Sequence, residues 1–117
     1  MAGDRRILLV EDDVLIGMML VDMFDALGYP EPEQATSVED ALAAIAAGPV
    51  DAALIDINLG ETKGWPVADA LAARDIPFAF TSGGGDVIPP AHAHRKLVSK
   101  PFWLSEIEAV LGGFFAG

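Results

Sequence analysis

The chain has 117 residues, of which 52% are hydrophobic, so it can bury a proper core in one domain but is too short for two. Its formal net charge is −11, and it has only 7 lysines and arginines for contacts to phosphates, so the composition argues against nucleic-acid binding and favours a protein that holds cations or meets basic partners. It contains no cysteine, which excludes disulfides and thiolate chemistry and fits the cytoplasm. No apolar stretch approaches the roughly 18 residues of a membrane span, and no signal-peptide pattern opens the chain, so we expect no contact with a membrane.

The first apolar run, Ile7 to Val10, predicts a short buried strand that ends directly in three acidic residues, Glu11 to Asp13. Apolar residues then recur at the spacing of an amphipathic helix, at Ile16, Met19, Leu20, Met23, Phe24 and Leu27. This stripe predicts that the methionines are core residues, and Gly28 marks the end of the helix. Asp13 precedes the stripe, so we expect its side chain to cap the helix N-terminus.

A weak edge strand and a second helix should follow. Residues 30–35 are polar and broken by prolines, which suits only an edge strand. Thr36 or Ser37 can cap the helix, and Glu39 stands three residues after Thr36, as in a capping box. Gly48 ends this helix.

The stretch from Ala52 to Leu59 predicts a strand that is covered on both faces and carries one carboxylate, Asp56, near its end. An ionised carboxylate cannot stay unpaired among apolar groups. Asp56 should therefore lie at the open end of the strand and face polar groups or a cation. In open α/β sheets, ligands bind at this end of the strands.

In the second half, the pattern predicts a helix over 65–74, strands over 76–80 and 97–99, and a C-terminal helix through Ile107 to Phe114. The segment between the last two strands interrupts this rhythm, because three glycines and two prolines stand where a fourth crossover helix is due. At most a single helical turn can form there, and we expect this segment to be the most mobile part of the chain.

Alternating strands and helices predict an α/β fold in which a parallel sheet is covered on both faces. The polar residues that end its strands are Glu11 and Asp12, Asp56, Thr81 and Lys100. They should converge on one edge, because parallel neighbours lie about 4.8 Å apart. Clustered carboxylates need a raised pKa or a divalent cation, and ligands that are all oxygen favour Mg²⁺. With a lysine and a hydroxyl nearby, this arrangement suggests attack of the Asp56 carboxylate on phosphorus.

Four motifs in this order resemble the receiver domain of two-component response regulators. They are Ile-Leu-Leu-Val-Glu-Asp-Asp at 7–13, Asp-Ala-Ala-Leu-Ile-Asp-Ile-Asn-Leu at 51–59, Phe-Thr-Ser at 80–82 and Ser-Lys-Pro-Phe at 99–102. The resemblance implies a doubly wound five-stranded parallel sheet in the flavodoxin/CheY-like order 2-1-3-4-5, a known order of this fold class, with a shortened or missing fourth helix. It also implies that residues 1–117 form a single receiver domain with no output domain.

The resemblance assigns a role to six residues. These are Asp56 as phosphoacceptor and metal ligand, Asp12 as direct Mg²⁺ ligand, Glu11 as water-mediated ligand, Asn58 as a ligand through its backbone carbonyl, Thr81 as the switch hydroxyl, and Lys100 as the contact to the phosphoryl group. A cis peptide bond between Lys100 and Pro101 is implied as well. The implied partners are a histidine kinase or histidine phosphotransfer protein and a downstream protein target.

The chain departs from the family pattern at three places. Leu97 stands three residues before the lysine, where the family often has an aromatic residue that moves with the switch hydroxyl. Gly60 replaces a common proline, and the shortened fourth helix removes the usual output face. Residues 78–83 loosely resemble the Phe-Ala-Thr-Gly-Tyr signature of a subgroup of stand-alone receivers.

Two other functions stay open. A small Mg²⁺-dependent phosphatase of the haloacid-dehalogenase type also uses aspartate, a hydroxyl and lysine, but that family resembles Asp-x-Asp at the nucleophile, where this chain has Asn58. A degenerate receiver would bind a partner without phosphorylation, and Leu97 leaves that reading open. We expect a phosphoacceptor with at most slow self-dephosphorylation, not an enzyme. We expect no metal ligation by His92 and His94, which lie in a proline-rich loop.

Phe114 and Phe115 near the C-terminus can cover the core or form a dimer contact, so the chain is expected to be a monomer or a weak dimer.

Overall fold

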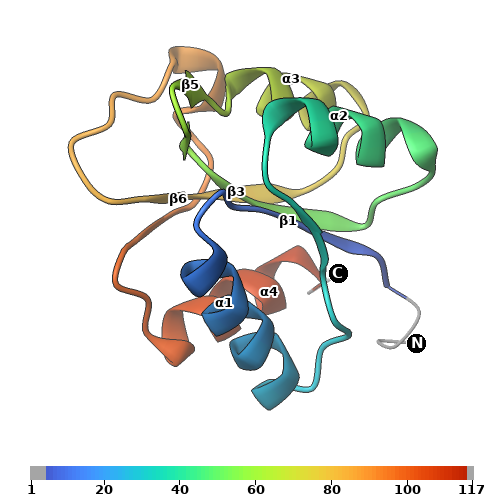
Figure 1. The fold of residues 1–117 in the computed structure, drawn as a ribbon, viewed down its shortest axis with the longest axis vertical. Coiled ribbons are helices and arrows are strands. Elements are labelled where there is room, and N and C mark those ends of the chain that lie inside the picture. The colour runs from blue at the N-terminus through green and yellow to red at the C-terminus, as the bar shows by residue number, and fades with distance from the viewer. Residues whose placement is uncertain (1–4, 116–117) are drawn as a thin grey trace.

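The computed structural model describes residues 5–115 as a parallel sheet between two layers of helices (Figure 1). The five strands of the sheet are β1 (Ile7–Val10), β2 (Glu33–Ala35), β3 (Ala52–Asp56), β6 (Phe78–Ser82) and β7 (Leu97–Ser99). They lie in the order β2-β1-β3-β6-β7, and every neighbouring pair is parallel. The predicted fold and strand order are confirmed. Strand β6 begins and ends two residues later than the sequence pattern predicted.

Four α-helices connect or follow the strands. They are α1 (Val14–Ala26), α2 (Val38–Ala47), α3 (Trp65–Ala73) and α4 (Leu104–Phe114). Helices α2 and α3 cover one face of the sheet, and α1 and α4 cover the other (Figure 1). Among the described residues, no helix has the length and apolar character needed to cross a membrane.

The strands separate two hydrophobic cores because successive side chains on a strand point to opposite faces. In β1, Leu8 and Val10 pack toward α2 and α3, whereas Ile7 and Leu9 pack toward α1 and α4. All four residues of β1 and all five of β3 are buried, as expected for central strands of a sheet that is covered on both sides. Phe114 and Phe115 pack against the second core, so they cover it as one of the two predicted roles requires.

The helix caps agree with the sequence in one case and differ in another. Asp13 accepts hydrogen bonds from the backbone N–H groups of Leu15 and Ile16 at 2.9 and 3.2 Å, which confirms it as the cap of α1. Helix α2 is capped by Ser37, which accepts from the N–H of Asp40 at 3.1 Å. The capping box based on Thr36 is wrong, because the chain enters the helix one residue later.

The prediction that the methionines of α1 lie in the core is wrong for one side of the helix. Leu20 and Phe24 are fully buried and Met23 packs against the core as predicted, but Met19 is 38% exposed. Helix α1 packs on the sheet along a narrow row of residues, so the outer part of the predicted stripe stays at the surface.

The crossover between β6 and β7 contains only a single 3-10 turn, η2 (Pro90–His92), which confirms that no regular fourth helix forms there. A small antiparallel hairpin after β3 was not expected. It consists of β4 (Asn58–Leu59) and β5 (Thr62–Lys63), and its turn contains Gly60 with a positive φ of 67°. A glycine suits this turn because the left-handed conformation costs it no steric strain. The peptide bond between Lys100 and Pro101 is cis, as the resemblance implied.

Candidate functional site

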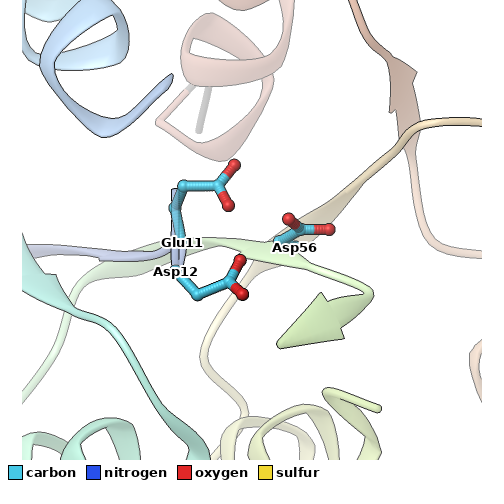
Figure 2. A group of neighbouring side chains, drawn as sticks. All are labelled: Glu11, Asp12 and Asp56. Atoms are coloured by element: carbon cyan, nitrogen blue, oxygen red, sulfur yellow. The ribbon is translucent and has the colours of Figure 1, made fainter. Parts of the chain in front are cut away.

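Three carboxylates meet at the carboxyl edge of the sheet. Glu11 and Asp12 directly follow β1, and Asp56 is the last residue of β3. Because Val10 pairs with Ile55 in the parallel ladder, the next residues along the two strands emerge side by side. One oxygen from each carboxylate lies within 4.8 Å of the others, and Figure 2 shows the three groups turned toward one another. The predicted convergence of these residues is confirmed.

Lys100 brings a positive charge into the same site from the end of β7. Its Nζ lies 2.7 Å from Oδ2 of Asp56 and 3.0 Å from Oε1 of Glu11. Its backbone N–H donates to the carbonyl of Ser82 at 2.8 Å, which fixes the lysine beside β6. Burial alone would lower the pKa of Lys100, but the contacts with Asp56 and Glu11 outweigh burial and raise that pKa. Lys100 is therefore a cation at neutral pH.

Glu11 is the most perturbed acid in the site. Its side chain is only 2% exposed. Burial, and after it the neighbouring Asp56, raise the pKa of Glu11 from the ordinary value of 4.5 to about 7, although the Lys100 ammonium and the Asp13 N–H act to lower it. Without an additional cation, Glu11 is thus close to half protonated at neutral pH. A site that holds one proton on clustered carboxylates can exchange that proton for a metal ion.

The donor set fits a hard divalent cation such as Mg²⁺. All candidate ligand atoms are oxygens. Oε1 of Glu11 is buried and, in spite of the nearby ammonium, accepts no hydrogen bond of regular geometry within residues 5–115. Asp12 and Asp56 are each oriented by a backbone donor, since Gly60 N–H donates to Asp12 Oδ2 at 2.8 Å and Asn58 N–H donates to Asp56 Oδ1 at 3.1 Å.

Two residues with hydroxyl groups end β6, and the sequence predicted a role in the site for only one of them, Thr81. Thr81 pairs in register with Asp56 on the neighbouring strand, so both side chains point to the same face of the sheet, and Thr81 is only 2% exposed. Ser82 points to the opposite face. Its hydroxyl donates to Asp86 Oδ2 at 2.5 Å and accepts from the N–H of Gly84 at 2.9 Å. Thr81 is thus placed beside Asp56, whereas the Ser82 hydroxyl is already occupied.

Asn58 lies where the sequence placed it, two residues after Asp56, but its side chain turns away from the three carboxylates. The amide Nδ2 donates to both oxygens of Asp86 at 3.1 Å, and Oδ1 accepts from Lys63 Nζ at 2.5 Å. No role for Lys63, Ser82 or Asp86 was predicted from the sequence. A signal was present, since Asp86 follows three consecutive glycines, where a charged side chain can fold back on its neighbours.

The histidines do not form part of a metal group. His92 is 3% exposed and its Nε2 lies 2.7 Å from Asp69 Oδ1, while its ring packs edge-on against Phe78 and Phe80. His94 is exposed. Within the part of the chain that the structure describes, the acidic group that could hold a metal ion consists of Glu11, Asp12 and Asp56.

Comparisons with known proteins agree with this geometry. The family model of the response regulator receiver domain matches residues 7–111. The solution structure of SdrG from Sphingomonas melonis Fr1 is similar, with 41% sequence identity, a TM-score of 0.83 and coverage of 97% of this chain and 98% of that chain. A comparison with curated protein sequences found no match.

Two further solution structures are similar over almost the whole chain. The BeF3-activated conformation of SdrG from Pseudomonas melonis Fr1 has 42% identity and a TM-score of 0.78, covering 96% of this chain and 97% of that chain. The receiver domain of the response regulator PhyR from Erythrobacter litoralis has 29% identity and a TM-score of 0.78, covering 97% of this chain and 92% of that chain. With the acidic cluster, the lysine and the matching strand order, these likenesses lead to one conclusion: the chain belongs to the response regulator receiver domain family.

Proposed function

We propose that this receiver accepts a phosphoryl group on Asp56 from the phosphohistidine of a histidine kinase or a histidine phosphotransfer protein, in the cytoplasm, where receiver domains usually act. The phosphorylated form then signals through contacts with a downstream protein. The observation that carries this proposal is the single site in which three carboxylates lie within 4.8 Å of one another and a lysine lies 2.7 Å from Asp56. This combination presents an anionic nucleophile next to positive charge.

In the transfer, a carboxylate oxygen of Asp56 attacks phosphorus, the bond from phosphorus to the donor's imidazole nitrogen breaks, and an acyl phosphate forms while the imidazole leaves and takes up a proton from solvent. Lys100 neutralises part of the charge on the phosphoryl oxygens. The Thr81 hydroxyl, on the same face as Asp56, donates to one of these oxygens.

Mg²⁺ would be held by Asp12, Asp56 and the backbone carbonyl of Asn58 directly and by Glu11 through water. When bound, it supplies positive charge that neutralises phosphoryl oxygens. The oxygen-only donor set and the buried Oε1 of Glu11, which accepts no regular hydrogen bond within residues 5–115, support this assignment.

Exposed apolar side chains next to the site support docking of a phosphate donor. Leu15 is 77% exposed, Met18 is 59% exposed and Trp103 is 70% exposed. Met19, Lys100 and neighbouring residues also line a groove there. A donor histidine must come within bonding distance of Asp56, so its protein has to cover this part of the surface.

Intact-mass spectrometry after incubation with Mg²⁺ and acetyl phosphate tests the phosphoacceptor. The protein should gain one phosphoryl group, and the gain should decay slowly by self-dephosphorylation. Asp56→Asn should abolish it. Asp75→Asn is a matched control, since Asp75 is an exposed turn residue with a positive φ of 56°, which asparagine tolerates, and should leave the gain unchanged.

The alternatives give different results in the same experiment. No gain in mass, together with no effect of Mg²⁺ on tryptophan emission, would favour a degenerate receiver. Continuous release of phosphate from a monoester such as para-nitrophenyl phosphate would favour a phosphatase.

Docking of the donor is tested with a panel of autophosphorylated histidine kinases. The kinase that phosphorylates the unmodified protein should transfer its phosphoryl group to Leu15→Ser about tenfold more slowly, because binding at such surfaces depends on a few apolar side chains. It should leave phosphorylation by acetyl phosphate unchanged. Equal loss with both donors would show damage to the site and no role in docking.

A further inference from the structure

Asp86 accepts hydrogen bonds from side chains on three strands. It accepts hydrogen bonds from Ser82 at the end of β6, from Asn58 in β4 and from Lys63 in β5, the last at 3.1 Å. Its side chain is only 9% exposed, although the rest of the segment around it is irregular. A half-buried carboxylate that accepts hydrogen bonds from three side chains restrains the chain around it.

The charge of Asp86 is stabilised by these contacts. The hydrogen bond from Ser82 lowers the pKa of Asp86, and Lys63 and Asn58 lower it further, against the opposing effect of burial. Lys63 also donates to Oδ1 of Asn58, so lysine, asparagine and aspartate form a closed ring of contacts. We refer to Asn58, Lys63, Ser82 and Asp86 as the clamp.

The clamp is connected to the carboxylates of the site through the β4–β5 hairpin. The β4–β5 hairpin supplies the backbone N–H groups that orient two of them, from Asn58 to Asp56 and from Gly60 to Asp12. The backbone of the hairpin thus donates hydrogen bonds to Asp12 and Asp56, and the side chains of Asn58 and Lys63 donate to Asp86. The placement of both carboxylates therefore depends on how firmly the hairpin is held.

Outside the clamp, segment 83–89 has little to hold it. Val87 is 88% exposed, and Gly84 and Gly85 have positive φ angles of 112° and 78°. Ile88 contacts the core, and Gly84 bonds back to Ser82. Asp86 is the residue through which this segment and the hairpin are joined.

We propose that Asp86 is a positioning residue for the phosphoacceptor site: it ties the β4–β5 hairpin to the end of β6 and so fixes Asp12 and Asp56 in the orientation that holds a divalent cation. This inference rests on the proposed function for its biological meaning, but its structural part concerns the ion-free protein alone. Residues that orient metal ligands from behind commonly contribute tenfold or more to metal affinity.

The test uses Asp86→Asn, which keeps the shape of the side chain but replaces one acceptor oxygen by an NH2 group, and this group faces the Asn58 amide in either orientation. In the ion-free protein, the hydrogen-exchange rates of the Asn58 and Gly60 amides should rise at least about fivefold, because their hydrogen bonds to Asp56 and Asp12 open more often. In a Mg²⁺ titration followed by amide chemical shifts, the Kd should rise about tenfold. Asp86→Glu, which restores the charge, should recover part of both effects.

Lys63→Met distinguishes a positioning effect of the clamp on Mg²⁺ binding from a simple effect of charge. Loss of a positive charge near the site would, by charge alone, tighten Mg²⁺ binding. If the clamp positions the hairpin, this variant instead weakens Mg²⁺ binding and speeds exchange of the same two amides. Glu61→Gln is the matched control for lost negative charge, since Glu61 lies exposed in the turn of this hairpin and makes no ion pair within residues 5–115, and it should change the Kd by less than about twofold.

The outcomes separate this inference from the proposed function. If Asp86→Asn behaves like Glu61→Gln in both measurements, or if Lys63→Met tightens Mg²⁺ binding without faster exchange, the clamp is overturned even when the unmodified protein is phosphorylated. If the unmodified protein gains no phosphoryl group, the proposed function fails, and the exchange rates still decide whether Asp86 holds the hairpin. Circular dichroism of each variant establishes that the fold is retained.

Discussion

Two regions form the carboxyl edge of the sheet, which we call the rim, and different interactions hold each of them in place. Glu11, Asp12 and Asp56 emerge from β1 and β3, whose residues are buried on both faces and paired along a continuous ladder. The β4–β5 hairpin and segment 83–89 lie beside them and are joined mainly by side-chain contacts to Asp86. The first region is thus fixed by buried strands, whereas the second reaches the core through Leu59 and Ile88 and is otherwise held by a few polar groups.

The difference has a consequence for signalling. A buried strand end moves only if the core rearranges, so we expect the backbone at the three carboxylates to move little when the site is occupied. Polar contacts at the surface can be exchanged for others at small free-energy cost. Changes that follow phosphorylation should therefore occur in the hairpin and in segment 83–89.

The largest expected effect is in hydrogen exchange. Amides within β1 and β3 should exchange roughly a thousandfold more slowly than those of residues 83–88, since buried strands open only with much of the molecule and irregular segments open locally. Mass spectrometry with short peptides, or heteronuclear NMR, measures both rates in one sample. Strong protection of residues 83–88 would contradict the division.

The free energy of unfolding should respond far more strongly to truncation of a side chain in β3 than to truncation of one in segment 83–89. Leu54 in β3 is 1% exposed and packs in the core beneath α1 and α4, so Leu54→Ala should lower the free energy of unfolding by about 3 kcal/mol through lost burial and the cavity left behind. Val87→Ala removes an exposed side chain and should change it by less than about 0.5 kcal/mol. Urea denaturation measures both. Equal effects would mean that segment 83–89 is part of the cooperative core.

The next effect is a pH dependence of stability that arises from Glu11. The pKa of Glu11 is about 7 in the folded protein, against an ordinary value of 4.5, so the folded state binds this proton more tightly than the unfolded state. This contribution to stability is complete below pH 4.5 and is lost as pH rises through 7. The free energy of unfolding of the ion-free protein should therefore fall by on the order of 2 kcal/mol across that window.

Two controls isolate Glu11 in this pH series. Glu11→Gln removes the titrating group, so the fall should disappear, and saturating Mg²⁺ should reduce it because the cation favours the ionised carboxylate. Asp86 acts with the opposite sign: its lowered pKa gives stability that is lost only as pH falls below the ordinary value of 3.8, outside the window. A fall that persists in Glu11→Gln would assign the pH dependence to another group.

The sequence predicted the fixed part of the rim well and the adjustable part poorly, for a physical reason. Apolar runs that end in Glu11 and Asp56 define both the strands and the residues that leave them, because parallel pairing brings strand ends together. The contacts of Lys63 and Asp86 depend on how two short loops fold back, and no periodic pattern encodes that. The hairpin was missed because each of its strands has only two residues. Met19 was misplaced because spacing alone does not show how widely a helix face is covered.

The smallest effect comes from two glycines, one packed against β3 and one in the open segment after β6. A Cβ atom on Gly64 would lie 2.9 Å from the carbonyl oxygen of Asp56 and 3.2 Å from Cγ2 of Ile55, so the chain after the hairpin passes directly against β3. Gly64→Ala must push this contact apart and should cost about 1 to 2 kcal/mol in the free energy of unfolding. A Cβ atom on Gly83 would meet nothing within 4 Å, so Gly83→Ala should have an effect within about 0.5 kcal/mol and can even stabilise the protein by restricting the unfolded chain. Thermal unfolding of the two variants measures the difference. If Gly64→Ala were as stable as Gly83→Ala, the end of β3 could shift at little cost in free energy, and the carboxylates would not be held more firmly than the loops beside them.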